Sequence, residues 1–81
     1  MGKNKYPPLD REQVELILKN SGFTLKRTQG SHAHWEGYIN NKRQIVTVDL
    51  SVGKKEKFGP RLLRNMIRQS GLNKKKFYSN L

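Results

Sequence analysis

The sequence predicts a single α+β domain, a two-layer α-β-β-β-α sandwich with helices on one face of a three-stranded antiparallel sheet. Apolar residues recur at helical spacing near both ends of the chain and alternate at strand spacing between them. With 81 residues the chain can bury one modest core and is too short for two. We therefore expect residues 1–81 to form one domain, with residues 1–8 as a loose N-terminal arm.

The first helix is predicted within "LDREQVELILKNSGF", residues 9–23. Asp10 is suited to cap it, and Gln13 stands at the position that closes a capping box. Gly22 marks the end of the helix. The predicted buried stripe consists of Val14, Ile17 and Leu18.

Two strands are expected next, joined by a turn at Gly30. In residues 23–29, Phe23 and Leu25 alternate with polar residues and are expected to share a face. Residues 32–39 alternate as well. One face is expected to carry Ala33, Trp35 and Ile39, and the other His32, His34, Glu36 and Tyr38.

A two-residue hairpin turn at Asn40-Asn41 should lead into the third strand, "RQIVTVDL". Val46, Val48 and Leu50 are expected on its core side. Because the helices cover only one face of the sheet, the two histidines should lie on the face left open to solvent.

The last third of the chain predicts a helix after Pro60, with Gly71 as its end signal. Its apolar residues are Leu62, Leu63, Met66 and Ile67, and its other side carries Arg61, Arg64 and Arg68. "NKKKFYSNL" can form a short third helix, with Phe77 and Leu81 docking on the core.

The charge of the chain is its most informative bulk property. Seventeen Lys and Arg face six Asp and Glu, a formal net charge of +11 with a pI near 10.4. From Lys54 onward there are six lysines and three arginines, against Glu56 as the one acidic residue. Such a surplus favours a polyanionic partner, nucleic acid above all, over a merely soluble cationic surface.

Other bulk features exclude several classes. There is no cysteine, so disulfides and thiolate metal sites cannot support the fold. We see no apolar run of the length that a membrane span or a signal peptide needs. We therefore expect a cytoplasmic protein.

The segment "QGSHAHWEGY", residues 29–38, contains both histidines of the chain. Cleavage of RNA without a metal needs a group that removes the 2′-hydroxyl proton, a group that protonates the leaving 5′-oxygen, and positive charge near phosphorus. Histidine suits the proton transfers because an imidazole titrates near neutral pH, and Lys or Arg suits the charge. The alternatives are two plain surface histidines, or a metal pair for which Asp49 and Glu36 are only candidate third ligands.

Three segments together resemble the HicA family of small bacterial toxins, messenger-RNA interferases of toxin–antitoxin systems. They are "REQVELILKNSGFTLKRTQGSHAHW", "VTVDL" and "GKKEKFGPRLLRNMIRQSGL", and the resemblance runs from about Leu9 to Phe77. It implies a fold like that of double-stranded-RNA-binding domains and a HicB-type antitoxin that covers the active histidine. His32 matches the histidine of the family's G-S-H box that is required for RNA cleavage, and Gly30 matches its glycine. "VTVDLS" departs from the family's more usual valine-proline-valine-histidine, so the resemblance gives this strand end no part in the site.

The histidine chemistry is compatible with a metal-independent ribonuclease, and the resemblance implies an endoribonuclease toxin that cleaves messenger RNA and so inhibits translation and growth. His32 is the expected general acid or base, with His34 as an assistant and Gly30 and Ser31 shaping the turn beside it. The residues expected to attract phosphates are Lys26, Arg27, Lys54, Lys55 and Lys57. The expected partners are RNA and the antitoxin, with no metal and no cofactor. The alternative is a non-catalytic double-stranded-RNA-binding module. A DNA-binding protein is disfavoured because no helix-turn-helix spacing is present.

Overall fold

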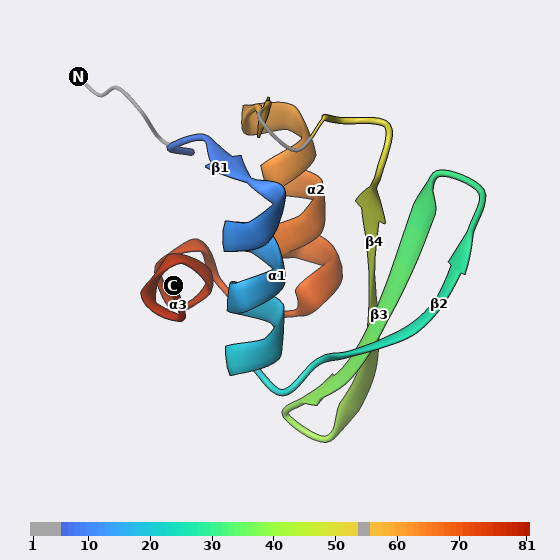
Figure 1. The fold of residues 1–81 in the computed structure, drawn as a ribbon. Helices are drawn as coiled ribbons and strands as arrows, with labels where there is room; N and C mark the ends of the chain where they lie inside the picture. Colours follow the sequence, from blue (N-terminus) through green and yellow to red (C-terminus); the bar gives the residue numbers. More distant parts are fainter. Residues whose placement is uncertain (1–5, 54–55) are drawn as a thin grey trace.

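The computed structural model describes residues 6–53 and 56–81, and its architecture confirms the predicted α+β class. The elements are β1 (Leu9–Asp10), α1 (Arg11–Asn20), β2 (Thr24–Gln29), β3 (His32–Ile39), β4 (Lys42–Asp49), β5 (Lys57–Phe58), α2 (Pro60–Ser70) and α3 (Lys74–Ser79). Strands β2, β3 and β4 form an antiparallel sheet in that order. Figure 1 shows α1 and α2 packed on one side of this sheet, with α3 on the far side of α1. No helix in the described part of the chain is long and apolar enough to cross a membrane.

Helix α1 begins with the capping box that the sequence predicted. The Asp10 side chain accepts a hydrogen bond from the Gln13 backbone N–H (2.8 Å), and the Gln13 side chain accepts one from the Asp10 N–H (2.9 Å). Two N–H groups that the helix leaves unpaired are thereby satisfied. After the helix, Gly22 adopts a left-handed backbone conformation with φ of +90°, which lets the chain reverse. The predicted stripe of Val14, Ile17 and Leu18 is fully buried.

The β3–β4 hairpin follows the predicted pattern. Asn40 and Asn41 both have positive φ, 54° and 66°, as a type I′ turn requires. On the core side of the two strands, Ala33, Trp35, Val46 and Val48 are buried. Leu50 lies beyond the end of β4 and is only half-buried, so it packs at the margin of the core.

Strand β2 differs from its prediction. Phe23 and Leu25 share the core-side face as predicted, since Leu25 pairs with Trp35, but Phe23 is buried at 2% exposure whereas Leu25 on the edge strand is 52% exposed. A β-bulge between Leu25 and Arg27 breaks the alternation along the strand, and all six residues of β2 are exposed. β2 is the edge strand farthest from α2, which packs against β4 at the opposite edge.

A second, two-stranded sheet was not predicted. β1 pairs antiparallel with β5, placing Leu9 opposite Phe58 and Asp10 opposite Lys57. Leu9 and Phe58 are both buried, at 4% and 1% exposure. This short ladder fixes the segment before α1 against the segment before α2, two parts of the chain that are far apart in sequence.

Helices α2 and α3 largely agree with expectation. Pro60 occupies the first turn of α2, and Gly71 ends the helix in a left-handed conformation with φ of +78°. Leu63, Met66 and Ile67 are buried, whereas Leu62 is half-buried and the three arginines of α2 are exposed. Phe77 of α3 is fully buried, as predicted. The docking predicted for Leu81 is wrong: α3 ends at Ser79, and Leu81 is 47% exposed.

Candidate active site on the open face of the sheet

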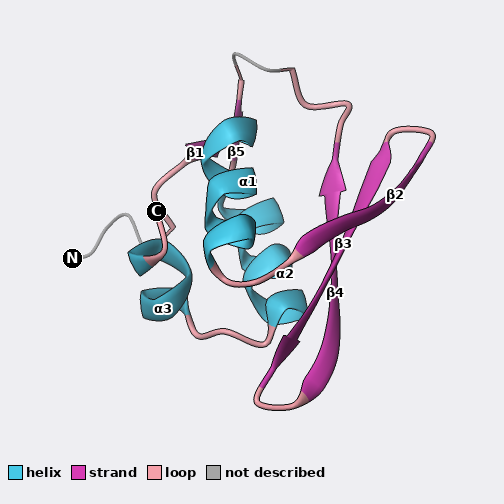
Figure 2. Cartoon of the chain, turned by 60° about the horizontal axis from the view of Figure 1, so that its bottom comes forward, coloured by secondary structure: helices cyan, strands magenta, loops and turns pink. Residues whose placement is uncertain are grey.

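Both histidines lie on the face of the β2–β3–β4 sheet that points away from the helices, called the open face below. Side chains alternate along β3, so Ala33, Trp35 and Gly37 turn toward the core and the residues between them turn outward. His32 is exposed and His34 is half-buried. Figure 2 shows the helices on the other side of the sheet, leaving the open face uncovered. The His32 ring is therefore accessible from solvent.

The register of the β3–β4 hairpin places Asp49 directly opposite His32. The Thr47 N–H points away from β3, at the outer edge of β4, and donates to the Gln69 side chain of α2 (3.0 Å). Thr47 and its partner His34 therefore form a cross-strand pair that has no backbone hydrogen bonds between its two members. Two residues further along the strand, Asp49 occupies the same kind of pair. Such pairs bring the Cα atoms to about 4.5 Å and the side chains closest together. Asp49 is thus the carboxylate beside His32.

Asp49 is held as an anion. The Ser51 hydroxyl and the Ser51 N–H both donate to one of its carboxylate oxygens, at 2.6 and 2.9 Å. These two hydrogen bonds, and then the positive charge of nearby His32, lower the pKa of Asp49 below its ordinary value. Asp49 therefore supplies a fixed negative charge at the position where a protonated imidazole would form.

His32 opens onto a pocket of about 180 Å³, called the His32 pocket below. Thr47 and Asp49 line it from the sheet, and residues of β5 and α2 line the other side: Phe58, Leu62, Asn65, Met66 and Gln69. Because Gln69 binds the outer edge of β4, α2 forms a wall beyond that edge. The lining of the pocket thus combines apolar side chains with a few polar groups and the imidazole.

A second pocket, of about 360 Å³, lies beside His34 and is called the His34 pocket below. Lys26, Arg27, Arg43 and Ile45 line it together with His34. Lys26 and Arg27 are both on the open face because the bulge in β2 sets two residues opposite one on β3. Thr47 connects the two pockets, since it lines the first and its Oγ1 lies 3.3 Å from Nδ1 of His34.

Part of the positive charge around the His34 pocket is neutralised locally. Glu36 forms ion pairs with Arg43 and with Lys26, the latter at 3.4 Å. The hydrogen bond from Arg43, and secondarily the one from Lys26, lower the pKa of Glu36. The hydrogen bond between Arg43 and Glu36 also raises the pKa of Arg43. Within the described residues Arg27 has no such acidic partner, so it is the cation of this pocket best placed to meet a phosphate.

The remaining predicted site residues lie at various distances from the two pockets. Gly30 and Ser31 form the tight turn between β2 and β3, where Gly30 has φ of +59° and the Ser31 carbonyl accepts from the Leu50 N–H (2.6 Å). This bond fastens the turn before His32 to the chain after Asp49. Lys57 lies exposed in β5 and lines neither pocket. Lys54 and Lys55 lie outside the described residues. Among residues 6–53 and 56–81, no group of three or more His, Asp or Glu side chains is placed to hold a metal ion.

Asp49, which the sequence analysis considered only as a candidate metal ligand, is the neighbour of His32 that it did not assign to the site. The sequence did contain this information, because a two-residue turn at Asn40-Asn41 fixes the register of the hairpin. Ile39 then pairs with Lys42, and pairing residues one by one away from the turn places His32 opposite Asp49. The contribution of α2 to the His32 pocket had no comparable local signal.

Comparison with known proteins places the chain in a family. The family profile described as the HicA toxin of bacterial toxin–antitoxin systems matches residues 11–72, more than half of the chain, from the start of α1 past the end of α2. No curated protein and no solved structure gave a significant match. The matched segment includes His32, Asp49 and both open-face pockets. The chain therefore belongs to the HicA family of bacterial toxin–antitoxin toxins.

Proposed function

We propose that this toxin is a metal-independent endoribonuclease that cleaves messenger RNA, with His32 as its general acid or base. The observation that carries the proposal is the placement of His32. Its imidazole is exposed at the mouth of a pocket, beside the Asp49 carboxylate, on the same face of the sheet as Lys26 and Arg27. This arrangement joins a proton-transfer group to cations that attract a phosphate.

The reaction needs no external nucleophile. The ribose 2′-oxygen attacks the adjacent phosphorus as its proton passes to a base, and the bond from phosphorus to the 5′-oxygen breaks as that oxygen gains a proton. The products are a strand ending in a 2′,3′-cyclic phosphate and a strand beginning with a 5′-hydroxyl. His32 would carry out one of the two proton transfers, for which positioned side chains typically contribute about 10²–10⁴-fold in rate.

The neighbours of His32 have supporting roles in this proposal. Asp49 would stabilise the imidazolium formed when His32 holds a proton, as a carboxylate does beside a catalytic histidine. Lys26 and Arg27 would bind phosphate oxygens, with His34 as an assistant. Gly30 and Ser31 would shape the turn that sets the start of β3. The phosphate-attracting role predicted for Lys54, Lys55 and Lys57 is retained as part of the proposal.

Product analysis tests this function. Purified toxin is incubated with RNA in the presence of a chelator, and the new ends are identified. Cyclic 2′,3′-phosphate and 5′-hydroxyl ends are the expected result. RNA that stays intact while bound to the protein would instead indicate a non-catalytic RNA-binding module. Cleavage that stops on adding the chelator would contradict a metal-independent reaction.

We also propose a HicB-type antitoxin as the protein partner, acting with the toxin in the cytoplasm. A net charge of +11 and the cations Lys26 and Arg27 on the open face suit an acidic surface, which would steer association and shield His32. Binding of the antitoxin should therefore block RNA cleavage, and the affinity of the two proteins should fall as the salt concentration is raised. Full cleavage by the saturated complex would contradict this role for the open face.

A further inference from the structure

The largest of the pockets described here lies outside the two on the open face. Its volume is about 580 Å³, and it is lined by Tyr6, Pro60, Arg61, Arg64 and Asn65. It is called the Tyr6 groove below. It joins the segment before β1 to the exposed side of α2, and none of the expected site residues lines it.

The Tyr6 groove carries two arginines without acidic partners. Arg61 and Arg64 are exposed, and neither forms an ion pair with any residue in the described part of the chain. The first turn of α2 contains no acidic residue either. A guanidinium binds a phosphate through paired hydrogen bonds, so two uncompensated ones in one groove favour a ligand with phosphate groups.

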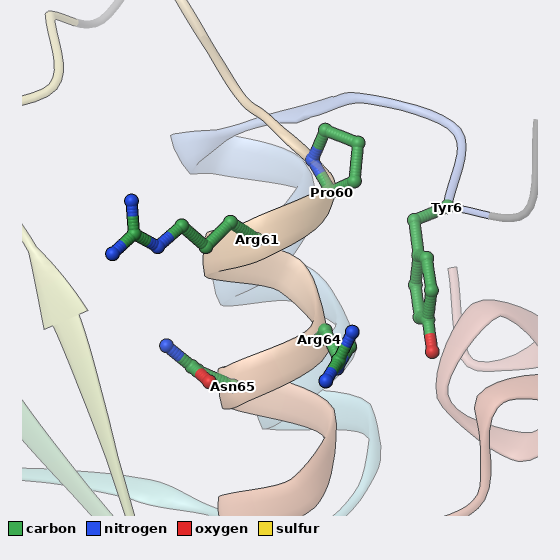
Figure 3. Close-up of a pocket in the computed structure, with 5 residues that line it drawn as sticks. All are labelled: Tyr6, Pro60, Arg61, Arg64 and Asn65. Atoms are coloured by element: carbon green, nitrogen blue, oxygen red, sulfur yellow. The ribbon is translucent and has the colours of Figure 1, made fainter.

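Tyr6 adds a positioned aromatic ring to these charges. It is half-buried, and the Lys74 ammonium of α3 lies 5.1 Å from its ring centroid. The chain next to it is tied down because the Tyr78 hydroxyl donates to the Pro7 carbonyl (2.9 Å). Figure 3 shows the Tyr6 ring nearly edge-on, with one face turned toward Arg64. An aromatic ring beside an arginine, with a second arginine on the same helix, is a combination that binds unpaired nucleotides, the base by stacking and the phosphate by charge.

The Tyr6 groove is a neighbour of the His32 pocket, because Asn65 lines both. Figure 3 shows Arg61 and Asn65 extending toward the side of α2 on which β4 lies, with Tyr6 on the opposite side. Arg61 and Asn65 are four residues apart, so they lie on one face of the helix about 6 Å apart along its axis. A strand that places a phosphate at His32 can thus pass over Asn65 toward Arg61, Arg64 and Tyr6.

We propose that the Tyr6 groove is a second nucleotide-binding subsite, which holds a single-stranded segment of the RNA near the linkage presented to His32. The inference rests on the proposed function, because that function places RNA in the His32 pocket. It adds the substrate class, which is single-stranded RNA, because a base can stack on Tyr6 only if it is unpaired.

Binding measurements test the charged part of the groove without any need for cleavage. Two double variants are made in a His32→Ala background. The first is Arg61→Ala with Arg64→Ala. The control is Lys19→Ala with Lys42→Ala, which removes the same charge from exposed positions outside the three pockets. The probe is a short labelled single-stranded RNA, titrated by fluorescence anisotropy between about 50 and 200 mM salt.

The arginine variant should bind roughly 10- to 30-fold more weakly near 0.1 M salt. Its slope of log K against log salt should fall by about 1.4, for two lost contacts to single-stranded phosphates. The lysine control should stay close to the parent in both quantities. Equal losses in the two double variants would overturn the subsite, because general charge would then explain the binding.

Tyr6 is tested by a pair of substitutions. Tyr6→Phe should keep the affinity for the single-stranded probe, and Tyr6→Leu should lower it by about fivefold or more through loss of stacking. Tyr6→Leu should leave binding of a fully paired RNA duplex unchanged. An equal effect on both probes, or on neither, would refute stacking in the groove. Thermal unfolding of each variant identifies any loss due to misfolding.

These outcomes are separable from failure of the proposed function. If the wild-type protein yields no cleaved ends, the enzyme proposal fails, while the binding comparison still decides on the groove. If cleavage occurs, the arginine variant should raise KM for long RNA and leave the cleavage of a dinucleotide, which cannot span both sites, unchanged. Equal effects on the two substrates would place Arg61 and Arg64 outside a separate subsite.

Discussion

Gly37 offers a direct test of which face of β3 points to solvent. A Cβ added at this position would lie 2.7, 2.8 and 2.9 Å from three ring carbons of Phe23. Carbon atoms in contact prefer about 3.5–4.0 Å, so the ring would have to retreat by about 1 Å. Phe23 is 2% exposed and packed in the core, where such overpacking typically costs about 1–3 kcal/mol.

The substitution Gly37→Ala should therefore lower the free energy of unfolding by about 1–3 kcal/mol. Each kcal/mol corresponds to about 4–8 °C in Tm for a domain of this size. Gly53→Ala is the matched control, because the three atoms nearest to its added Cβ all belong to the flexible Glu56 side chain, at 3.4 Å or more. Both substitutions remove similar freedom from the unfolded chain, so the difference between them isolates the clash with the ring.

The assay is urea unfolding followed by the fluorescence of buried Trp35, combined with the additional variant Phe23→Leu. If the clash is the cause, Phe23→Leu should cost less in the Gly37→Ala background than alone, with a coupling energy of about 0.5–3 kcal/mol. Equal stability of Gly37→Ala and Gly53→Ala would refute the packing. It would also remove support for placing His32 on the open face, because a shift of one residue reverses the two faces of a strand.

Three further predictions concern other parts of the fold. Asp10→Ala removes the cap of α1 and should lower the free energy of unfolding by about 1 kcal/mol in a denaturant titration; no loss would mean that the box contributes nothing. Phe77→Ala should lower the free energy of unfolding by about 3–5 kcal/mol, and Leu81→Ala by about 0.5 kcal/mol or less. Similar losses for the two variants in a thermal melt would contradict the exposure of Leu81. The pKa of Asp49 is lowered in the folded state, chiefly by Ser51, so its charge stabilises the fold above the ordinary aspartate pKa and this contribution is lost as pH falls through the lowered value. The stability difference between wild type and Asp49→Asn should thus be largest near neutral pH and shrink below about pH 4, and a difference that is constant with pH would contradict the assignment.

The elements with local sequence signals were predictable. The capping box of Asp10 and Gln13, the positive-φ turn at Asn40-Asn41 and the end of α2 at Gly71 each depend on residues within a few positions of one another. The open-face position of His32 and His34 followed from strand alternation combined with helices on a single face of the sheet.

The features that failed or were missed depend on contacts between distant segments. The β1–β5 ladder consists of two residue pairs, too short to leave a periodic pattern. The bulge between Leu25 and Arg27 arises from pairing with β3 and has no marker such as glycine within β2. Leu25 is exposed because β2 is the edge strand farthest from α2. The His32 pocket needs α2 to dock at the β4 edge through Gln69 and Thr47, and the Tyr6 groove needs the N-terminal segment to reach α2. No local pattern encodes either arrangement.

The most direct test of the account compares His32→Ala with His34→Ala, the same substitution two residues apart on one strand and one face. RNA cleavage is measured in single-turnover reactions with chelator present, after unfolding curves have shown both variants to be folded. A fall of about 10²–10⁴-fold for His32→Ala, with a much smaller loss for His34→Ala, is the predicted result. A folded His32→Ala protein that cleaves RNA at the wild-type rate would contradict the central claim.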